Sequence, residues 1–193
     1  MKTTLLCIMV LLGTMTPRPL TALEILPNEL PEHISIYASL YLAERLGPNL
    51  LHESVEFVGG RGPRGEERSF WLKFDYSPPR FPQESVRFEV VVTWAGDCKM
   101  ASRSEFPACS EAPHSCEVNV SSGDARRVAR ENGLSPGIKD WEVELKYMSQ
   151  FEGLVWTVSN TTGRISQGYR GKIAIIRAGN GKFLEMWGWK KQA

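Results

Sequence analysis

The chain has 193 residues, enough for one large domain or two small ones with a substantial buried core. Its 42% hydrophobic and 23% charged residues are typical of globular proteins and argue against disorder, collagen and coiled coil. The first 22 residues hold Lys2 and Arg18 but no acid, which leaves 21 of the 23 basic residues and all 22 acidic residues in the remainder. That balance argues against a nucleic-acid-binding protein, which needs an excess of positive charge.

Residues 1–22 have the pattern of a cleavable secretory leader. Lys2 precedes an apolar run from Leu5 to Leu12, and helix-breaking prolines follow before the small residue Ala22. The run is much shorter than the ~20 residues that span a bilayer. We therefore expect a secreted, extracellular protein. The alternative is an uncleaved leader that serves as an N-terminal membrane anchor.

Cys7 would be removed with the leader, which leaves Cys98, Cys109 and Cys116. Secretion places these three cysteines in an oxidising compartment, where an odd number allows at most one internal disulfide. Cys98 ends one predicted strand and Cys116 begins the next, so antiparallel pairing predicts a Cys98–Cys116 disulfide with Cys109 left over. Asn119 and Asn160 begin N-glycosylation sequons. Asn119 alternates with Val118 and Val120, so we expect its side chain on the solvent face of a strand.

Residues 33–122 predict one α+β domain. Apolar residues from Ile34 to Leu46 have helical spacing, and Gly47-Pro48 ends that helix. Four strand-like segments follow, and the expected fold is a helix wrapped by an antiparallel sheet. The strands are expected near residues 55–60, 70–76, 87–94 and 115–121.

The second half is expected to repeat this plan incompletely. Residues 123–135 are interpreted as a short charged linker, although 124–131 have a helical composition. From Trp141 to Val158 the apolar residues fit helical spacing, while the rival strand pattern alternates strictly from Trp141 to Tyr147. Gly179-Asn180-Gly181 predicts the turn of a hairpin between residues 168 and 189.

The residues give no sign of an enzyme, a metal site or a cofactor. The three histidines (His33, His52 and His114) are far apart in the sequence, without the spacing of a zinc site or a catalytic dyad. There is also no nucleophile elbow or phosphate-binding loop.

The C-terminal part is basic and rich in tryptophan. From Arg164 onward there are seven basic residues and one acidic residue, Glu185. Such an end can adsorb to anionic lipid or glycan through its charge and its interfacial indole rings. The ordinary alternative is a sheet with a solvated basic face and core tryptophans. The candidate binding residues are Lys172, Arg177, Lys182, Trp187, Trp189, Lys190 and Lys191.

Several short motifs resemble the latexin family, which comprises latexin, the retinoic acid receptor responder protein and eggshell relatives. In the first half these are Ala38 and Tyr41 before Gly47-Pro48, then Leu72-Lys73-Phe74 and the strand containing Asn119. In the second half they are Ser135-Pro136 and Gly153-Leu154-Val155-Trp156, which look like the family's second helix.

The resemblance implies two cystatin-like domains, the second of them truncated. It favours a helix over residues 136–158, followed by the hairpin, within a second unit at 136–190. That helix is expected to pack on the first domain and give one compact body. The implied function is non-enzymatic binding, and inhibition, of a metallocarboxypeptidase. A host-defence or extracellular matrix protein that binds anionic surfaces through its basic end is the alternative. The papain-type inhibitory hairpin of true cystatins is absent.

Overall fold

The protein's structure is a computed structural model that describes residues 30–62, 68–102, 105–166 and 168–192. Its helices and strands form two units that share one plan, a helix followed by a four-stranded antiparallel sheet. The fold class is therefore α+β, as predicted. The leader at residues 1–22 lies outside the described residues. Within them, no helix is long and apolar enough to cross a membrane.

The first unit begins with α1 (Glu32–Leu46) and the short α2 (Pro48–Ser54). One face of α1 is buried against the sheet through residues four positions apart, in agreement with the predicted helix. Its end is set by Gly47, which has a φ of +87° and donates its N–H to the carbonyl of Ala43 at 2.9 Å. The buried residues of α1 are Ile34, Ala38, Leu42 and Leu46.

The first sheet has the strand order β1-β2-β3-β4. Its strands are β1 (Val55–Arg61), β2 (Ser69–Tyr76), β3 (Val86–Thr93) and β4 (Cys98–Met100). Alternation places aromatic and aliphatic residues of β2 and β3 on the buried face, where the rings of Phe74 and Phe88 stack with centroids 5.6 Å apart. The first three strands confirm the prediction, while β4 was missed.

The predicted fourth strand at residues 115–121 is wrong. This segment begins as a 3-10 helix, η1 (Pro113–Cys116), and continues in extended form without joining the first sheet. Instead, the N–H groups of Asn119 and Val120 both donate to the carbonyl of Ala178, at 2.9 and 3.1 Å. The segment therefore connects the first unit to the second.

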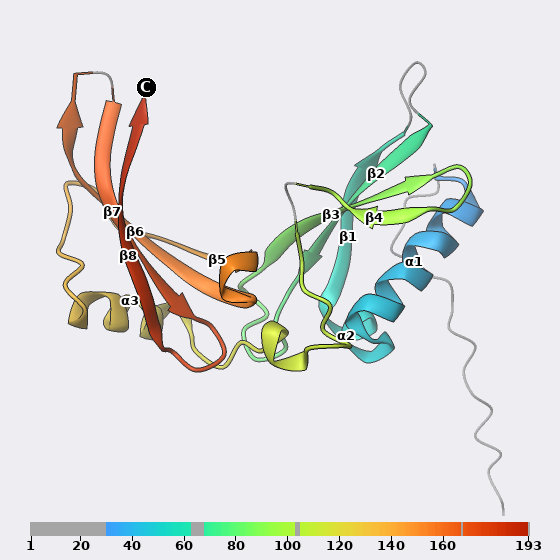
Figure 1. Ribbon diagram of the computed structural model, residues 1–193, viewed down its shortest axis with the longest axis horizontal. Coiled ribbons are helices and arrows are strands. Elements are labelled where there is room, and N and C mark those ends of the chain that lie inside the picture. The colour runs from blue at the N-terminus through green and yellow to red at the C-terminus, as the bar shows by residue number, and fades with distance from the viewer. Residues whose placement is uncertain (1–29, 63–67, 103–104, 167, 193) are drawn as a thin grey trace, which may run out of the picture.

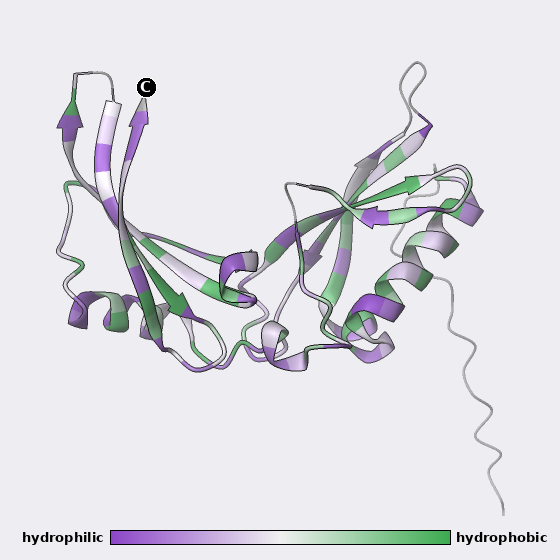
Figure 2. Cartoon of the chain, viewed as in Figure 1, coloured by the Kyte–Doolittle hydropathy of each residue, from purple (hydrophilic) through white to green (hydrophobic). Residues whose placement is uncertain are grey.

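The second unit begins with α3 (Ser122–Glu131), a helix where a linker at 123–135 was predicted. The side chain of Ser121 accepts a hydrogen bond from the N–H of Asp124 and caps this helix. Its buried face consists of Ala125 and Ala129. Five of its ten residues are charged and three are apolar (Ala125, Val128 and Ala129), so hydrophilic and hydrophobic bands alternate along the helix (Figure 2).

The second sheet is complete, which corrects the expectation of a truncated unit. It has the order β5-β6-β7-β8, and the predicted helix at 136–158 is replaced by two strands and the short η2 (Ser149–Phe151). The strands are β5 (Glu142–Met148), β6 (Gly153–Ile165), β7 (Gly168–Arg177) and β8 (Phe183–Gln192). The rival strand pattern was therefore the right one. The predicted hairpin is confirmed as β7 and β8, with Gly179–Gly181 in its turn.

The disulfide joins Cys109 to Cys116, with Cα atoms 5.6 Å apart, so the predicted Cys98–Cys116 pairing is wrong. The prediction failed because Cys116 lies in η1 rather than on a strand. Among the described residues, Cys98, at the start of β4, is the free cysteine. It pairs with Val92 across β3 and β4, is partly buried, and packs against the hydrophobic cluster of buried side chains.

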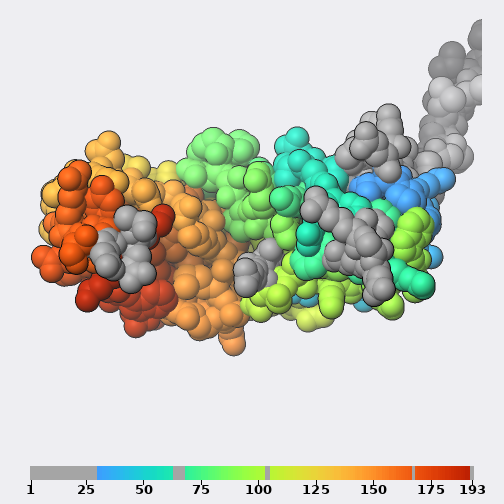
Figure 3. All heavy atoms as spheres, turned by 90° about the horizontal axis from the view of Figure 1, so that it is seen from above, coloured from blue at the N-terminus to red at the C-terminus, as the bar shows by residue number. Residues whose placement is uncertain are grey.

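The two units lie side by side and meet where η1 and the following segment pass between them (Figure 1). The space-filling view shows their surfaces in contact (Figure 3). Buried side chains of both units form one continuous cluster, to which Cys116 and Val118 belong. We expected one compact body because a helix at 136–158 would pack on the first domain. That helix is absent from the described residues, and the two units are joined instead by the shared buried cluster.

Candidate functional site

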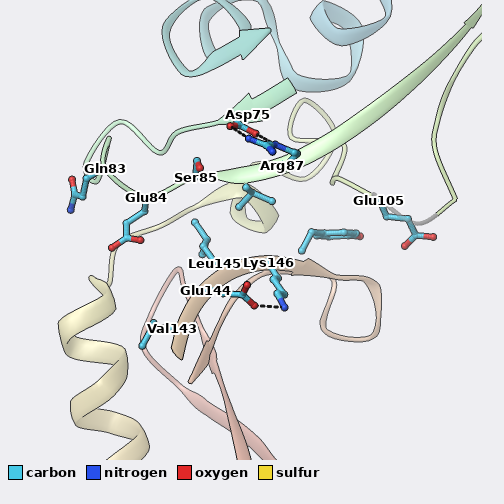
Figure 4. Close-up of a pocket in the computed structure, with 12 residues that line it drawn as sticks. Asp75, Gln83, Glu84, Ser85, Arg87, Glu105, Val143, Glu144, Leu145 and Lys146 are labelled. Atoms are coloured by element: carbon cyan, nitrogen blue, oxygen red, sulfur yellow. Dashed lines mark hydrogen bonds and ion pairs between the residues drawn. The ribbon is translucent and has the colours of Figure 1, made fainter. Parts of the chain in front are cut away.

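A groove of about 690 Å³ lies between the two units. One wall is formed by the facing ends of β2 and β3 with the loop that joins them, and the other wall is β5 (Figure 4). Glu105, from the connecting segment, lines one end. We call this space the junction groove. Its lining residues are Asp75, Gln83, Glu84, Ser85, Val86, Arg87, Glu105, Val143, Glu144, Leu145, Lys146 and Tyr147.

The first wall carries a bidentate ion pair between neighbouring strands. Arg87 donates from Nε and Nη2 to the two carboxylate oxygens of Asp75, each at 2.8 Å. The Asp75 side chain is 17% exposed and that of Arg87 is 63% exposed, so the carboxylate anchors a guanidinium that reaches solvent. The hydrogen bonds and charge of Asp75 raise the pKa of Arg87 above its usual value. Arg87 therefore presents a fixed positive charge in the groove.

The second wall is the free edge of β5, because this strand stands at one end of the sheet order. Its side chains include a second ion pair, between Glu144 and Lys146. Among the described residues, Glu84 and Glu105 have no cationic partner within 4 Å. A strand edge flanked by mixed charges is suited to binding an extended polypeptide by backbone and ionic contacts.

The groove carries no histidine or cysteine. His33, His52 and His114 lie on α1, α2 and η1, and His33 contacts the rings of Tyr37 and Trp94. Over the described ranges, no group of three or more histidine, cysteine, aspartate or glutamate residues is arranged to hold a metal ion. The groove combines ion pairs with a strand edge.

The structure divides the predicted basic binding residues between the two faces of the β7–β8 hairpin. The pair Ile173–Trp187 and the pair Gly171–Trp189 lie on one face, while Lys172 and Lys190 alternate onto the other. Arg177 and Lys182 are close together at the turn, where the N–H of Arg177 donates to the carbonyl of Lys182 at 2.9 Å. Lys191 pairs with Tyr169 near the other end of the strands. The candidate set is therefore not one continuous surface.

Trp189 is used in packing. Its indole lies over Gly171, where an added Cβ would come 2.6 Å from the ring, so this position has no room for a side chain. Its N–H donates to the carbonyl of Lys172 at 3.2 Å. An indole held on its own sheet in this way is poorly placed to insert into a membrane interface.

The two sequons differ in exposure. Asn119 is exposed, although it lies in the connecting segment rather than on a strand, and its amide donates to the carbonyl of Gly179 at 3.1 Å. Asn160 is 1% exposed, and its Nδ2 donates to the carbonyl of Ser135 at 2.6 Å. A glycan on Nδ2 of Asn160 has no path to solvent in this fold, which argues against that predicted site.

Charge separates along the chain. Residues 23–120 contain 9 basic and 15 acidic residues, a net charge of −6. Residues 121–193 contain 12 basic and 7 acidic residues, a net charge of +5. The near-neutral total conceals two regions of opposite sign, so electrostatic attraction of a partner depends on which region it meets.

Sequence reasoning missed the junction groove because its residues come from distant segments. Alternation alone places Asp75 and Arg87 on the outward faces of two strands, but only the β2–β3 register brings them opposite each other. The β5 wall was missed together with β5 itself. No family model, curated protein or solved structure matches the chain.

Proposed function

We propose that the chain is a secreted, non-enzymatic binding protein of the latexin type, built from two cystatin-like units. Its junction groove binds a metallocarboxypeptidase and inhibits it. The observation that carries the proposal is the repeated plan of a helix followed by four antiparallel strands, with the two units meeting at a groove. The Cys109–Cys116 disulfide is compatible with an extracellular location.

The motifs behind the family resemblance support the proposal unequally. Ala38 and Tyr41 lie on α1, and Leu72-Lys73-Phe74 lies on β2, where the resemblance expected them. Gly153 to Trp156 lies on β6 rather than on a helix, and the segment containing Asn119 is not a strand. The support therefore rests on the first unit and on the repeated plan.

The groove suggests how such a protein would bind. A surface segment of the protease can add to the free edge of β5 through its backbone, while Arg87 and the acidic side chains fix its direction. The proposed role is binding without cleavage of the partner. Inhibition then follows from blocking access to the partner's active site.

The test is a titration of carboxypeptidase A with the purified protein. We expect inhibition at low micromolar protein, and its absence would reject the proposal. The double variant Arg87→Glu and Lys146→Glu reverses two groove charges and should weaken inhibition roughly tenfold or more. Lys73→Glu with Lys99→Glu, on β2 and β4 outside the groove, also reverses two charges; it is the matched control and should inhibit as the unchanged protein does. Equal weakening by both variants would place the binding surface elsewhere.

The alternative function, binding to anionic surfaces, is favoured by the +5 charge of residues 121–193. Cosedimentation with phosphatidylserine vesicles tests it. If this function is right, Lys190→Gln with Lys191→Gln reduces binding, and unchanged binding excludes the basic end as the contact. Inhibition of carboxypeptidase would be unaffected by that variant.

A further inference from the structure

A second groove, of about 580 Å³, lies between α3 and the loop that follows it. It is at the end of the second unit that faces away from the first unit (Figure 1). Arg126 and Arg130 line it from α3, and Lys139 and Trp141 line it from the loop. We call it the α3–loop groove. It is separate from the junction groove and shares no residue with the predicted basic set.

The cations of this groove are held in place by the loop. Nη2 of Arg126 donates to the carbonyl of Trp141 at 3.3 Å, and the guanidinium of Arg130 lies 5.8 Å from the Trp141 ring centroid. The loop itself is tied to the sheet, because the N–H of Ile138 donates to the carbonyl of Thr161 at 2.7 Å. Positioned cations lose less conformational entropy when they bind an anion.

The positive surface continues beyond the groove. Nζ of Lys139 lies 4.2 Å from the centroid of the Tyr169 ring, and the guanidinium of Arg164 lies 5.8 Å from the same ring. Lys139 thus belongs both to the groove and to a second cluster of cations around an aromatic ring. The result is a run of four basic side chains drawn from α3, the loop and β6, three of which lie over the two aromatic rings.

These four cations lack acidic partners in the part of the chain that the structure describes, since none is within 4 Å of a carboxylate. The acids of α3 are engaged elsewhere. Arg127 pairs with Asp124 at 3.2 Å and with Glu131 at 3.3 Å. Asp140 is the one acidic residue that lines the groove. The uncompensated positive charge is therefore available to an external anion.

We propose that the α3–loop groove and the adjoining Arg164–Tyr169 surface bind a linear sulfated glycan. Sulfate groups accept paired hydrogen bonds from guanidinium groups, and a run of four cations matches an extended polyanion better than a single phosphate. The choice of an extracellular polyanion rests on the proposed secretion, whereas the site itself rests on the geometry.

A lipid surface is a poorer match for the same cations. Insertion into a bilayer uses aromatic rings that project into it, whereas the Trp141 and Tyr169 rings lie beneath cations and are only partly exposed. Ile138 is the one large hydrophobic side chain of the loop that is strongly exposed. The concave groove suits a chain that lies within it.

The test is binding to a heparin-derived oligosaccharide, measured by titration calorimetry and by the salt concentration that elutes the protein from immobilised heparin. Arg130→Gln with Lys139→Gln should weaken binding roughly tenfold and elute at lower salt. The matched control is Arg170→Gln with Lys190→Gln, which removes the same charge from the β7–β8 hairpin and should change affinity much less. Arg126 is left intact in both variants, because it supports the loop.

Each outcome decides between specific possibilities. Equal losses in the two variants would mean that binding follows net charge alone, and the proposed site would be rejected. Binding that survives complete desulfation of the oligosaccharide would reject sulfate recognition, and stronger binding to phosphatidylserine vesicles would favour a membrane. Because the variants leave the junction groove unchanged, carboxypeptidase inhibition is expected to stay constant, which separates this proposal from the proposed function.

Discussion

The two units follow the same order of elements but fill their cores with different side chains. In the first, aromatic rings dominate: Phe88 stacks between Phe74 and Phe106, with centroids 5.6 and 4.8 Å away. In the second, a single tryptophan, Trp156, is surrounded by aliphatic residues and alanines. The comparison shows that the same order of helix and strands can form around cores of different composition, as long as apolar residues face the core.

The helices differ in a related way. α1 has 15 residues and buries large aliphatic side chains, whereas α3 has 10 residues and buries two alanines. Because alanine allows the closest approach of helix and sheet, the large side chain at this interface is supplied by the sheet. A short helix with a small buried face gains less from packing, so it depends more on its cap.

The largest effect is expected when either core loses its central ring. Trp156→Ala and Phe88→Ala each remove a fully buried side chain and should each cost about 3–5 kcal/mol of unfolding free energy. Trp156→Phe should cost less, losing chiefly the hydrogen bond from Nε1 to the carbonyl of Val120 at 2.8 Å. Urea denaturation followed by circular dichroism measures these values.

The same pair of variants tests how strongly the units depend on each other. Since the buried cluster is continuous, we expect each variant to unfold in one transition. Hydrogen exchange in which Trp156→Ala exposes the amides of β5–β8 while those of β1–β3 stay protected would contradict this expectation.

A second difference between the units concerns alkaline stability. Burial raises the pKa of Tyr76, in the first unit, to about 12. The unfolded value is about 10, so the folded state holds the proton more tightly between these values, and stability falls as pH rises from 10 to 12. The loss should reach up to about 3 kcal/mol.

Tyr76→Phe should abolish this loss, at a cost near 1 kcal/mol at neutral pH for the hydrogen bond to the carbonyl of Cys116. Tyr37→Phe, on the exposed face of α1, is the control and should keep the alkaline loss. Unfolding by urea at several pH values provides the measurement. An unchanged slope in Tyr76→Phe would assign the loss to another group.

The disulfide lies between the two units, so its removal shows how much the connection contributes. Cys109→Ser with Cys116→Ser opens a short loop, since the cysteines are seven residues apart, and should cost about 2.5 kcal/mol. Cys98→Ser is the control and should be close to neutral. Peptide mapping under non-reducing conditions should find Cys109 linked to Cys116, and a link involving Cys98 would refute the assignment.

The smallest expected effect concerns the helix caps. Ser121→Ala removes the acceptor for the N–H of Asp124 and should cost about 1 kcal/mol. Ser122→Ala, one residue into α3, should change stability by less than about 0.5 kcal/mol. α1 has no side-chain cap, so we expect only the helix of the second unit to depend on a capping side chain. Equal melting temperatures for the two variants would contradict it.

Most of the first unit could be predicted from the sequence, because each predicted element has one buried face. The helical spacing of apolar residues in α1 and the alternation of apolar residues in β2 can each be recognised within the segment itself. β4 was missed because it has three residues, too few to show a period.

The second unit was harder to predict because β6 is buried on both sides. From Leu154 to Val158 every residue is buried, so alternation disappears, and the apolar residues fit helical spacing equally well. α3 was taken for a linker because half of its ten residues are charged. The junction groove and the α3–loop groove depend on the packing of distant segments, which neither spacing nor composition encodes.

Asn160 shows how a fold can conflict with its own biosynthesis. Its side chain links three segments, donating to Ser135 and accepting from the N–H of Lys172 at 2.8 Å. It also begins a sequon, and the transferase that recognises sequons acts on nascent chains before they fold. If the chain is secreted as proposed, folding of the second unit competes with sugar transfer at this residue. A chain that carries a glycan on Asn160 cannot form these hydrogen bonds to Ser135 and Lys172. The yield of native protein then depends on whether folding or sugar transfer comes first.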